Sequence, residues 1–373
     1  MDPVALHIHE RISTQAVIRV LTLLTEGSFS ATYKFALFTA ILDLCIENTS
    51  RDGVPPTVLT TRQLAEKVLG LYWNHAVPYG HQGVLRQGGG PAGGQAEIVR
   101  RIERVRAKWA GSGSDTLFRA HLDHRAEFKR LLDFTEWKLI EMPISRLQLL
   151  GRQEDRFLYE YNWTQSVRQS SVSGYQRGTA SGFDNRLLLL PGVARNLVRL
   201  NGVLRPLFHR EWAVMVAGMN RLPEGDLERF LFGSERSPLD IVRGPLLELQ
   251  DSRCFYCHER LSGRAEVDHF IPWSRYPDEG IDNLVASDQR CNNKKRDFLA
   301  ADEHVERWVR RTRPLSDQID SIASDVRWRR DADRTLSVAS AIYLRLPMGT
   351  RVWVRGSEFA VSDRVRIESA LRE

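Results

Sequence analysis

The chain has 373 residues, of which 42% are hydrophobic and 27% are charged, a composition typical of globular proteins with cores of ordinary size. No apolar run reaches the roughly 18 to 20 residues that a membrane-spanning helix needs, and the N-terminus lacks the basic, apolar and small-residue regions of a secretory signal. We therefore expect a cytoplasmic protein without a membrane partner. The formal net charge of +6 is compatible with a polyanionic partner but does not identify one.

The first part of the chain carries helical patterns. Two lie within residues 14 to 48, where Cys45 is predicted to be a core residue, and a third follows Thr60 and Thr61, which are suitable helix caps. Three short helices fit a small bundle of any function and also a helix-turn-helix or winged-helix unit. We define residues 1–78 as an N-terminal helical domain and leave its contact with DNA open.

A glycine-rich segment follows. Residues 79–96 hold seven glycines and no periodic apolar pattern, which predicts a flexible linker or an exposed loop and a domain boundary. The segment lacks the Lys-Ser/Thr pair of a phosphate-binding loop and follows no strand pattern, so we do not assign it that role.

Residues 97–250 form a predicted helical middle region. Glu97–Trp109 is an amphipathic pattern whose arginines fit a solvated face and also a surface along a phosphate backbone. We expect strands at WKLIEMPI (137–144) and RFLYEYNWT (156–164), and a helix over 185 to 220 with Pro206 in a first turn. Further helices are predicted at 223 to 232, 238 to 250, 302 to 311 and 315 to 346, and a closing strand pair at 350 to 363. The last of these lie in a C-terminal helical region, residues 301–373.

Three of the four cysteines gather in one stretch. Cys254-x-x-Cys257 has the spacing of a zinc knuckle, and Cys291 follows 34 residues later with Asp288 three residues before it. A tight turn lets two thiolates face one tetrahedral ion, and Asp288 or His258 can supply the fourth ligand. Packed, reduced thiols without zinc are the alternative.

Further motifs lie in and after this stretch: VDHFIP at 267–272, IDNL at 281–284 and CNNKK at 291–295. In these residues the chain resembles the HNH endonucleases, also called ββα-metal or His-Me finger nucleases, in the subgroup whose finger is braced by cysteines around zinc. The resemblance covers residues 254 to 300 and says nothing about the rest. It implies a small ββα finger, residues 251–300, within a mainly α, multidomain α+β protein.

The resemblance also implies roles for single residues. His269 would be the general base, and Asp268 and Asn292 would hold Mg²⁺ or a similar divalent cation. Asn283 would tie down the loop between the strands, and Lys295 would contact a phosphate, with Lys294 and Arg296 as weaker candidates. Because neighbours on a strand point to opposite faces, a bulge or twist is needed to bring Asp268 and His269 to one ion.

We therefore expect a metal-dependent endonuclease that hydrolyses phosphodiester bonds of nucleic acid, with double-stranded DNA as the expected substrate and structural zinc in the finger. A restriction or phage-defence effector is the expected biological role. The alternative is a non-catalytic zinc-finger protein that only binds nucleic acid.

Overall fold

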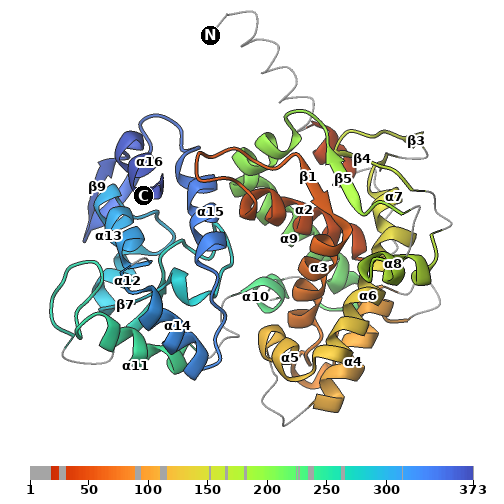
Figure 1. The fold of residues 1–373 in the computed structure, drawn as a ribbon, viewed down its shortest axis with the longest axis horizontal. Coiled ribbons are helices and arrows are strands. Elements are labelled where there is room, and N and C mark those ends of the chain that lie inside the picture. Colours follow the sequence, from red (N-terminus) through yellow and green to blue (C-terminus); the bar gives the residue numbers. More distant parts are fainter. Residues whose placement is uncertain are drawn as a thin grey trace, which may run out of the picture. The chain divides into compact units, whose positions relative to one another are not determined.

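The structure is a computed structural model that describes residues 18–24, 31–88, 94–109, 116–150, 153–163, 167–179, 183–223, 225, 227–233, 239–261, 265–312 and 314–372. The chain is mainly helical with small sheets, as predicted (Figure 1). It divides into two compact units, Met1–Cys45 with Pro56–Gly233 and Ile46–Pro55 with Ser234–Glu373. Among the described residues, no helix combines the length and apolar character needed to cross a membrane.

The first unit contains most of the helices. Its elements are residues 18–24 (helical), α2 (Tyr33–Glu47, whose last two residues belong to the second unit), β1 (Val58–Thr60), α3 (Thr61–His75), η1 (Gly80–Gln82), α4 (Glu97–Trp109), α5 (Leu117–Asp123), α6 (Arg125–Glu141), α7 (Pro143–Leu147), β2 (Leu149–Leu150), β3 (Gln153–Glu154), β4 (Tyr159–Tyr161), α8 (Gln169–Gln176), β5 (Arg186–Leu189), α9 (Val193–Asn220) and α10 (Leu227–Phe232).

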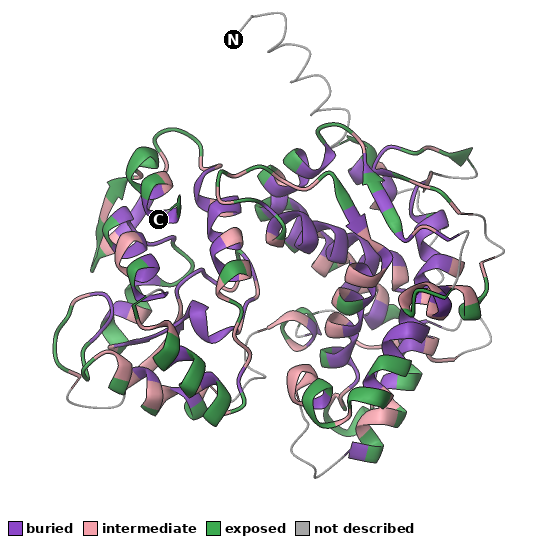
Figure 2. Cartoon of the chain, viewed as in Figure 1, coloured by how far each residue is buried: buried purple, intermediate pink, exposed green. Residues whose placement is uncertain are grey.

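The core of the first unit is built around α2 and α9. Helix α2 is buried along nearly its whole length, including Cys45 as predicted (Figure 2). The rings of Phe38 on α2 and Phe208 on α9 stack with centroids 3.8 Å apart. Such aromatic packing fixes the two helices against each other because each ring buries a large apolar surface.

A three-stranded antiparallel sheet covers one side of this core. Its order is β1-β5-β4, with Leu59 opposite Leu187 and Tyr159 opposite Leu189. These four side chains are buried. Helix α3 starts directly after β1, where Thr60 and Gln63 form a reciprocal capping box, which confirms the predicted helix start.

Three sequence predictions in this unit differ from the structure. The segment 137–144 is helical rather than a strand. Its residues up to Glu141 belong to α6, and Pro143 is the first residue of α7, a position that suits proline in a helix. Residues 186–189 form β5, so the predicted helix begins only at Val193. Pro206 lies inside α9 rather than in a first turn; its position is exposed, so the backbone carbonyl that loses its donor faces water. The strand predicted at 156–164 is present as β4.

The glycine-rich segment is anchored to the first unit where it is described. The Gln87 side chain accepts hydrogen bonds from Trp212 Nε1 at 2.8 Å and Thr32 Oγ1 at 2.9 Å, and Thr32 N donates to the Gln87 carbonyl at 2.9 Å. Residues on both sides of the segment belong to the first unit. Residues 89–93, which hold three of its glycines, lie outside the described part.

The second unit contains the cysteine-rich stretch. Its elements are α11 (Asp240–Leu249), β6 (Glu266–His269), η2 (Ile281–Asn283), β7 (Leu284–Ser287), α12 (Gln289–Lys295), α13 (Asp302–Thr312), α14 (Ser316–Asp325), α15 (Ala332–Tyr343), β8 (Arg351–Arg355), β9 (Glu358–Val361) and α16 (Arg364–Arg372). Strands β6 and β7 pair antiparallel and α12 follows directly, so the ββα order is present. The predicted closing strand pair is present as β8 and β9.

A segment from the early part of the chain completes this unit. The carboxylate of Glu47 lies 2.6 Å from Arg334 on α15 and accepts a hydrogen bond from Tyr276 in the loop after β6. Asp52 pairs with Arg372 on α16 at 2.9 Å. Residues 46–55 are thus held by side chains that lie more than 200 positions later in the sequence.

Candidate functional site

The cysteine cluster forms where two distant pieces of the second unit meet. Cys254 and Cys257 lie in the turn after α11, whereas Asp288 and Cys291 lie at the start of α12. One ligand atom from each of the four residues lies within 4.8 Å of the other three. The Cys257 thiol donates to Asp288 Oδ2 at 3.2 Å. Three sulfurs and a carboxylate oxygen at this spacing can hold a tetrahedral zinc ion.

Asp288 has two separate tasks in this cluster. Its Oδ1 accepts hydrogen bonds from the backbone N–H groups of Arg290 at 2.8 Å and Cys291 at 2.9 Å, which caps α12. Its Oδ2 remains directed at the thiols. His258, the other candidate for a fourth ligand, is exposed and lies outside the group. The geometry therefore favours Asp288.

The thiols differ in how readily they ionise. A hydrogen bond from Cys291 lowers the pKa of Cys254 to about 7, whereas burial raises the pKa of Cys257 to about 11. One sulfur thus carries much of the negative charge near neutral pH, and metal binding would release protons from the others.

A second group of polar residues lies between β6 and α12. Glu266 and Asp268 are two residues apart on β6, so their side chains share one face of the strand. Asp268 Oδ2 lies 2.9 Å from Lys295 Nζ on α12 and accepts a hydrogen bond from Tyr256 Oη at 2.6 Å. Asn292 Nδ2 donates to Glu266 Oε2 at 2.6 Å. These contacts bring Asp268 and Asn292 to the same side of the finger.

His269 ends β6 and is set apart from this face. The β6–β7 register runs without interruption from Glu266 to His269, so the structure shows no bulge that would turn His269 toward the face of Asp268. The imidazole lies beside Trp273, with ring centroids 5.3 Å apart, and its Nε2 is buried with no hydrogen-bond partner among the described residues. Burial lowers the pKa of His269, and the charges of Asp268 and Asp278 oppose this effect. The imidazole is therefore neutral near pH 7.

Asn283 joins the two ends of the loop between the strands. Its Oδ1 accepts from Ile271 N at 2.8 Å, and its Nδ2 donates to the carbonyls of Ile271 at 3.2 Å and Asp278 at 3.0 Å. The residue is fully buried. It therefore holds the loop that starts directly after His269 and makes no contact with solvent.

Lys295 does not lie at the surface, where a contact with a phosphate requires a side chain to be. It is fully buried, and its ammonium group binds Asp268 and the carbonyl oxygen of His269, the latter at 2.8 Å. The exposed cations of this helix region are Arg290, Lys294 and Arg296. Lys295 thus connects the two neighbouring residues of β6 rather than offering a charge to solvent.

Two residues of this group escaped the sequence analysis. Glu266 lies two positions before Asp268, and the period-two rule for strands was the signal that would have placed it beside Asn292. Tyr256 lies between the two cysteines of the first half-site, and nothing in its local pattern indicated a bond to Asp268 twelve residues later.

Comparison with known protein families agrees with this geometry. Residues 254–301 match the family model described as HNH endonuclease, over the same residues that carry both polar groups. Residues 13–231 match the model described as a domain of unknown function, DUF8808. No curated protein and no solved structure matches the chain.

Proposed function

Since the chain belongs to the DUF8808 family, whose model covers more than half of it, and carries an HNH endonuclease domain, we propose that it is a metal-dependent nuclease that cleaves double-stranded DNA. The family of the larger region has no stated activity, so the chemistry is argued from the finger. A cytoplasmic location belongs to the same proposal.

Hydrolysis of a phosphodiester needs a base for the attacking water and positive charge near the phosphate. We assign the base to His269, because its neutral imidazole has a nitrogen free to accept a proton. Asp268 and Asn292 would hold a divalent cation such as Mg²⁺ through a carboxylate and an amide oxygen, the ligands that hard cations prefer. When bound, the cation would stabilise negative charge on the phosphate and the leaving oxygen.

One observation carries this proposal. The contacts Asn292–Glu266 and Lys295–Asp268 both cross from α12 to β6, so both expected cation ligands lie where α12 contacts β6 within the matched domain. Asn283 supports the arrangement because it fixes the loop after His269.

A plasmid-nicking assay with Mg²⁺ or Mn²⁺ tests the activity. We expect cleavage by the wild type and a loss of about 100-fold or more in His269→Ala, since a general base contributes roughly 10² to 10⁴ in rate. His258→Ala, on an exposed residue of the same unit, is the matched control and should retain activity. Wild type and His269→Ala that are equally inert on single- and double-stranded DNA and RNA would contradict the proposal.

A non-catalytic zinc-finger protein is the second candidate, and one observation favours it. Asp268 already holds a hydrogen bond from Tyr256 and an ion pair with Lys295, as a purely structural carboxylate would. Titration of the zinc-loaded protein with Mn²⁺ separates the two candidates. A site that Asp268→Asn weakens supports the nuclease, and no Mn²⁺ site at millimolar concentration supports the binding protein.

We also propose restriction or phage defence as the biological role, because HNH nucleases with long helical extensions resemble such effectors. Deletion of the gene in its native host should increase phage plaquing, and a chromosomal His269→Ala variant should have the same effect. Unchanged phage sensitivity across a broad panel would remove this role while leaving the nuclease proposal intact.

A further inference from the structure

The first unit carries an exposed cationic surface that the proposed chemistry does not use. It is formed by α4 and by the first two turns of α6, and we call it the α4–α6 surface. Its seven exposed cations are Arg100, Arg101, Arg104, Lys108, Arg125, Lys129 and Arg130.

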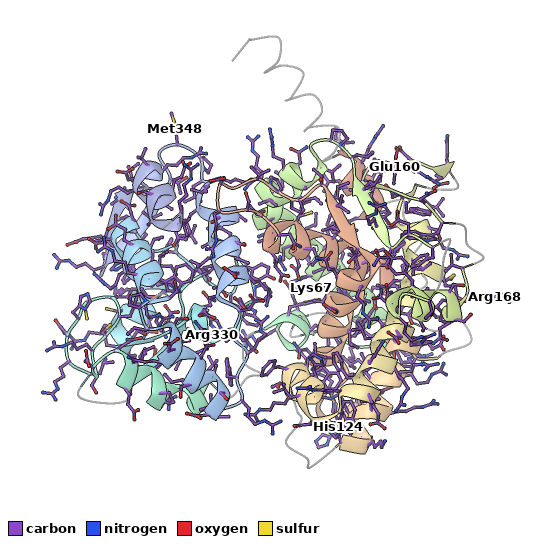
Figure 3. The ribbon with its side chains drawn as sticks, in the orientation of Figure 1. Lys67, His124, Glu160, Arg168, Arg330 and Met348 are labelled. Atoms are coloured by element: carbon purple, nitrogen blue, oxygen red, sulfur yellow. The ribbon has the colours of Figure 1, made fainter. Side chains whose placement is uncertain are left out.

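Contacts between the two helices make this surface continuous. Glu127 on α6 binds Lys108 and accepts a hydrogen bond from Trp109 Nε1 at 2.9 Å, and it also lies 3.9 Å from Arg130. The indole of Trp109 stacks on His124, at the junction of α5 and α6 (Figure 3), with centroids 4.1 Å apart. The end of α4 is therefore fixed against the start of α6.

Charge accumulates in this part of the chain. Helix α4, helix α5 and residues 125–130 together hold nine Lys or Arg against four Asp or Glu, which accounts for most of the net charge of +6. Glu127 is already bound by its neighbours, whereas Arg100, Arg104 and Arg125 have no ion-pair partner within the described ranges. Unpaired cations that crowd on one face repel each other, so a polyanion would stabilise them.

The spacing of these cations suits a phosphate backbone. Arg100, Arg104 and Lys108 follow each other at four-residue intervals on one side of α4, about 6 Å apart along the helix axis. Each strand of duplex DNA presents one phosphate about every 3.4 Å of the helix axis. The row therefore spans a few consecutive phosphates, and Arg101 is held partly in place because its guanidinium lies 3.4 Å over the ring of Phe134.

The scaffold under the surface points to duplex DNA as the polyanion. Helix α3 follows β1 directly, α6 packs on α3, and the later strands pair so that β5 lies between β1 and β4. The same strand order, with the last strand between the other two, occurs in winged-helix DNA-binding units; here α4 and α5 lie between α3 and α6 in the sequence. Only the N-terminal half of α6 is exposed, since residues 131–136 are all buried, so its first turns are the part of this helix that can enter a major groove, which is wide enough to admit an α-helix.

We propose that the α4–α6 surface binds duplex DNA, with α4 along the phosphate backbone and the first turns of α6 toward the groove. The inference rests on the proposed function for its choice of substrate. It places affinity in the first unit and chemistry in the second.

Two double variants with the same spacing test this surface. Arg100→Gln/Arg104→Gln alters it, and Arg195→Gln/Arg199→Gln on α9 is the matched control. All four arginines are exposed, each pair lies one turn apart on a helix, and none has an ion-pair partner in the described part of the chain. Both variants lower the net charge equally. The measurement is fluorescence anisotropy of a labelled DNA duplex, with His269→Ala as the background so that no cleavage interferes.

We expect the α4 variant to weaken duplex binding about tenfold or more and to reduce the slope of log K against log salt concentration by about 2, one for each lost phosphate contact. The α9 variant should stay within about twofold of its background. Equal losses in both variants, or no loss in either, would overturn the inference. Tighter binding of duplex RNA with the same dependence on Arg100 and Arg104 would overturn the choice of DNA. Because binding is measured without catalysis, an inert finger would leave this result interpretable.

Discussion

The amide of Asn292 has two ends with opposite chemistry, because its nitrogen donates hydrogen bonds and its oxygen accepts them or binds cations. Glu266 accepts the hydrogen bond from Nδ2 at 2.6 Å, which fixes the orientation of the amide. The oxygen is then the end that remains for a cation. Glu266 is a positioning residue in this account, since it acts on the cation through Asn292.

Removal of this acceptor should weaken the cation site. In Glu266→Ala we expect a dissociation constant for Mn²⁺ about tenfold or more above that of the wild type, since partners of metal ligands typically contribute 10- to 100-fold. Glu266→Gln retains an acceptor oxygen and should recover part of the affinity. Glu259→Ala, on an exposed residue of the same unit, is the control. Titration calorimetry on zinc-loaded protein measures all four, and equal affinity in wild type and Glu266→Ala would contradict the positioning role.

His209 shows how one histidine can make stability depend on pH. Its ring stacks on Phe232 with centroids 3.8 Å apart, and its Nε2 is buried without a hydrogen-bond partner in the described structure. Burial, followed by the charge of Arg205, lowers the pKa of His209 well below its usual value. Below a pH of about 6.5 the unfolded chain binds a proton at this site that the folded chain does not bind.

The free energy of unfolding of the first unit should therefore fall as pH decreases below about 6.5. Below the pKa of His209 in the folded protein, this residue causes no further change in that free energy. One such site contributes at most about 1.4 kcal/mol per pH unit. In His209→Phe the dependence between pH 7 and pH 5.5 should be shallower by up to that amount. Urea unfolding at several pH values measures the slope, and parallel curves for wild type and His209→Phe would count against this account.

At the scale of single elements, the finger was the part best predicted from the sequence. Its motifs are short and local. The meeting of Cys254, Cys257, Asp288 and Cys291 follows from their spacing, and the order β6, β7 and α12 is what the resemblance to HNH endonucleases implies. The segment 137–144 failed because strand and helix share its apolar composition, and burial in α6 and α7 decided the outcome. No sequence pattern shows that the ammonium group of Lys295 is buried against Asp268.

Helix α13 is the element that holds the finger from outside its motif. Arg311 is buried, and its guanidinium donates to the carbonyls of Leu284 and Asp282, both at 2.8 Å. Burial lowers the pKa of Arg311 to about 10, so it remains charged at neutral pH. Trp308, one turn earlier, donates to the same Asp282 carbonyl at 2.8 Å.

Truncation of this arginine should destabilise the second unit. Arg311→Ala leaves a cavity and removes two charged hydrogen bonds to buried carbonyls, and we expect a loss of about 3 kcal/mol or more. Arg310→Ala is the matched control, because the neighbouring arginine is exposed and surface substitutions usually change stability by within about 0.5 kcal/mol. Urea midpoints report the difference, and similar midpoints for the two variants would show that α13 does not anchor the finger through Arg311.

At the scale of the whole molecule, the division into units is the feature that the sequence least revealed. The domain limits of 79–96 and 251–300 were drawn from composition and motifs, and they remain predictions. In the structure, residues 46–55 belong to the second unit although the chain around them belongs to the first. Their attachment depends on ion pairs with residues far along the chain, such as Glu47 with Arg334 and Asp52 with Arg372. Pairings at that sequence separation leave no local pattern.

This division predicts how the protein would respond to removal of zinc from the cysteine cluster. Because binding of a structural zinc contributes directly to folding, chelation should destabilise the second unit and leave the first largely intact. Residues 46–55 should lose amide protection together with 254–301, although about 200 positions separate them. Hydrogen exchange with and without a chelator measures this loss of protection directly. Cys257→Ser should reproduce the effect of the chelator. Cys45→Ala, at a cysteine outside the cluster, is the control and should retain about one zinc per chain. Protection of 46–55 that follows the first unit instead would show that this segment does not fold with the finger.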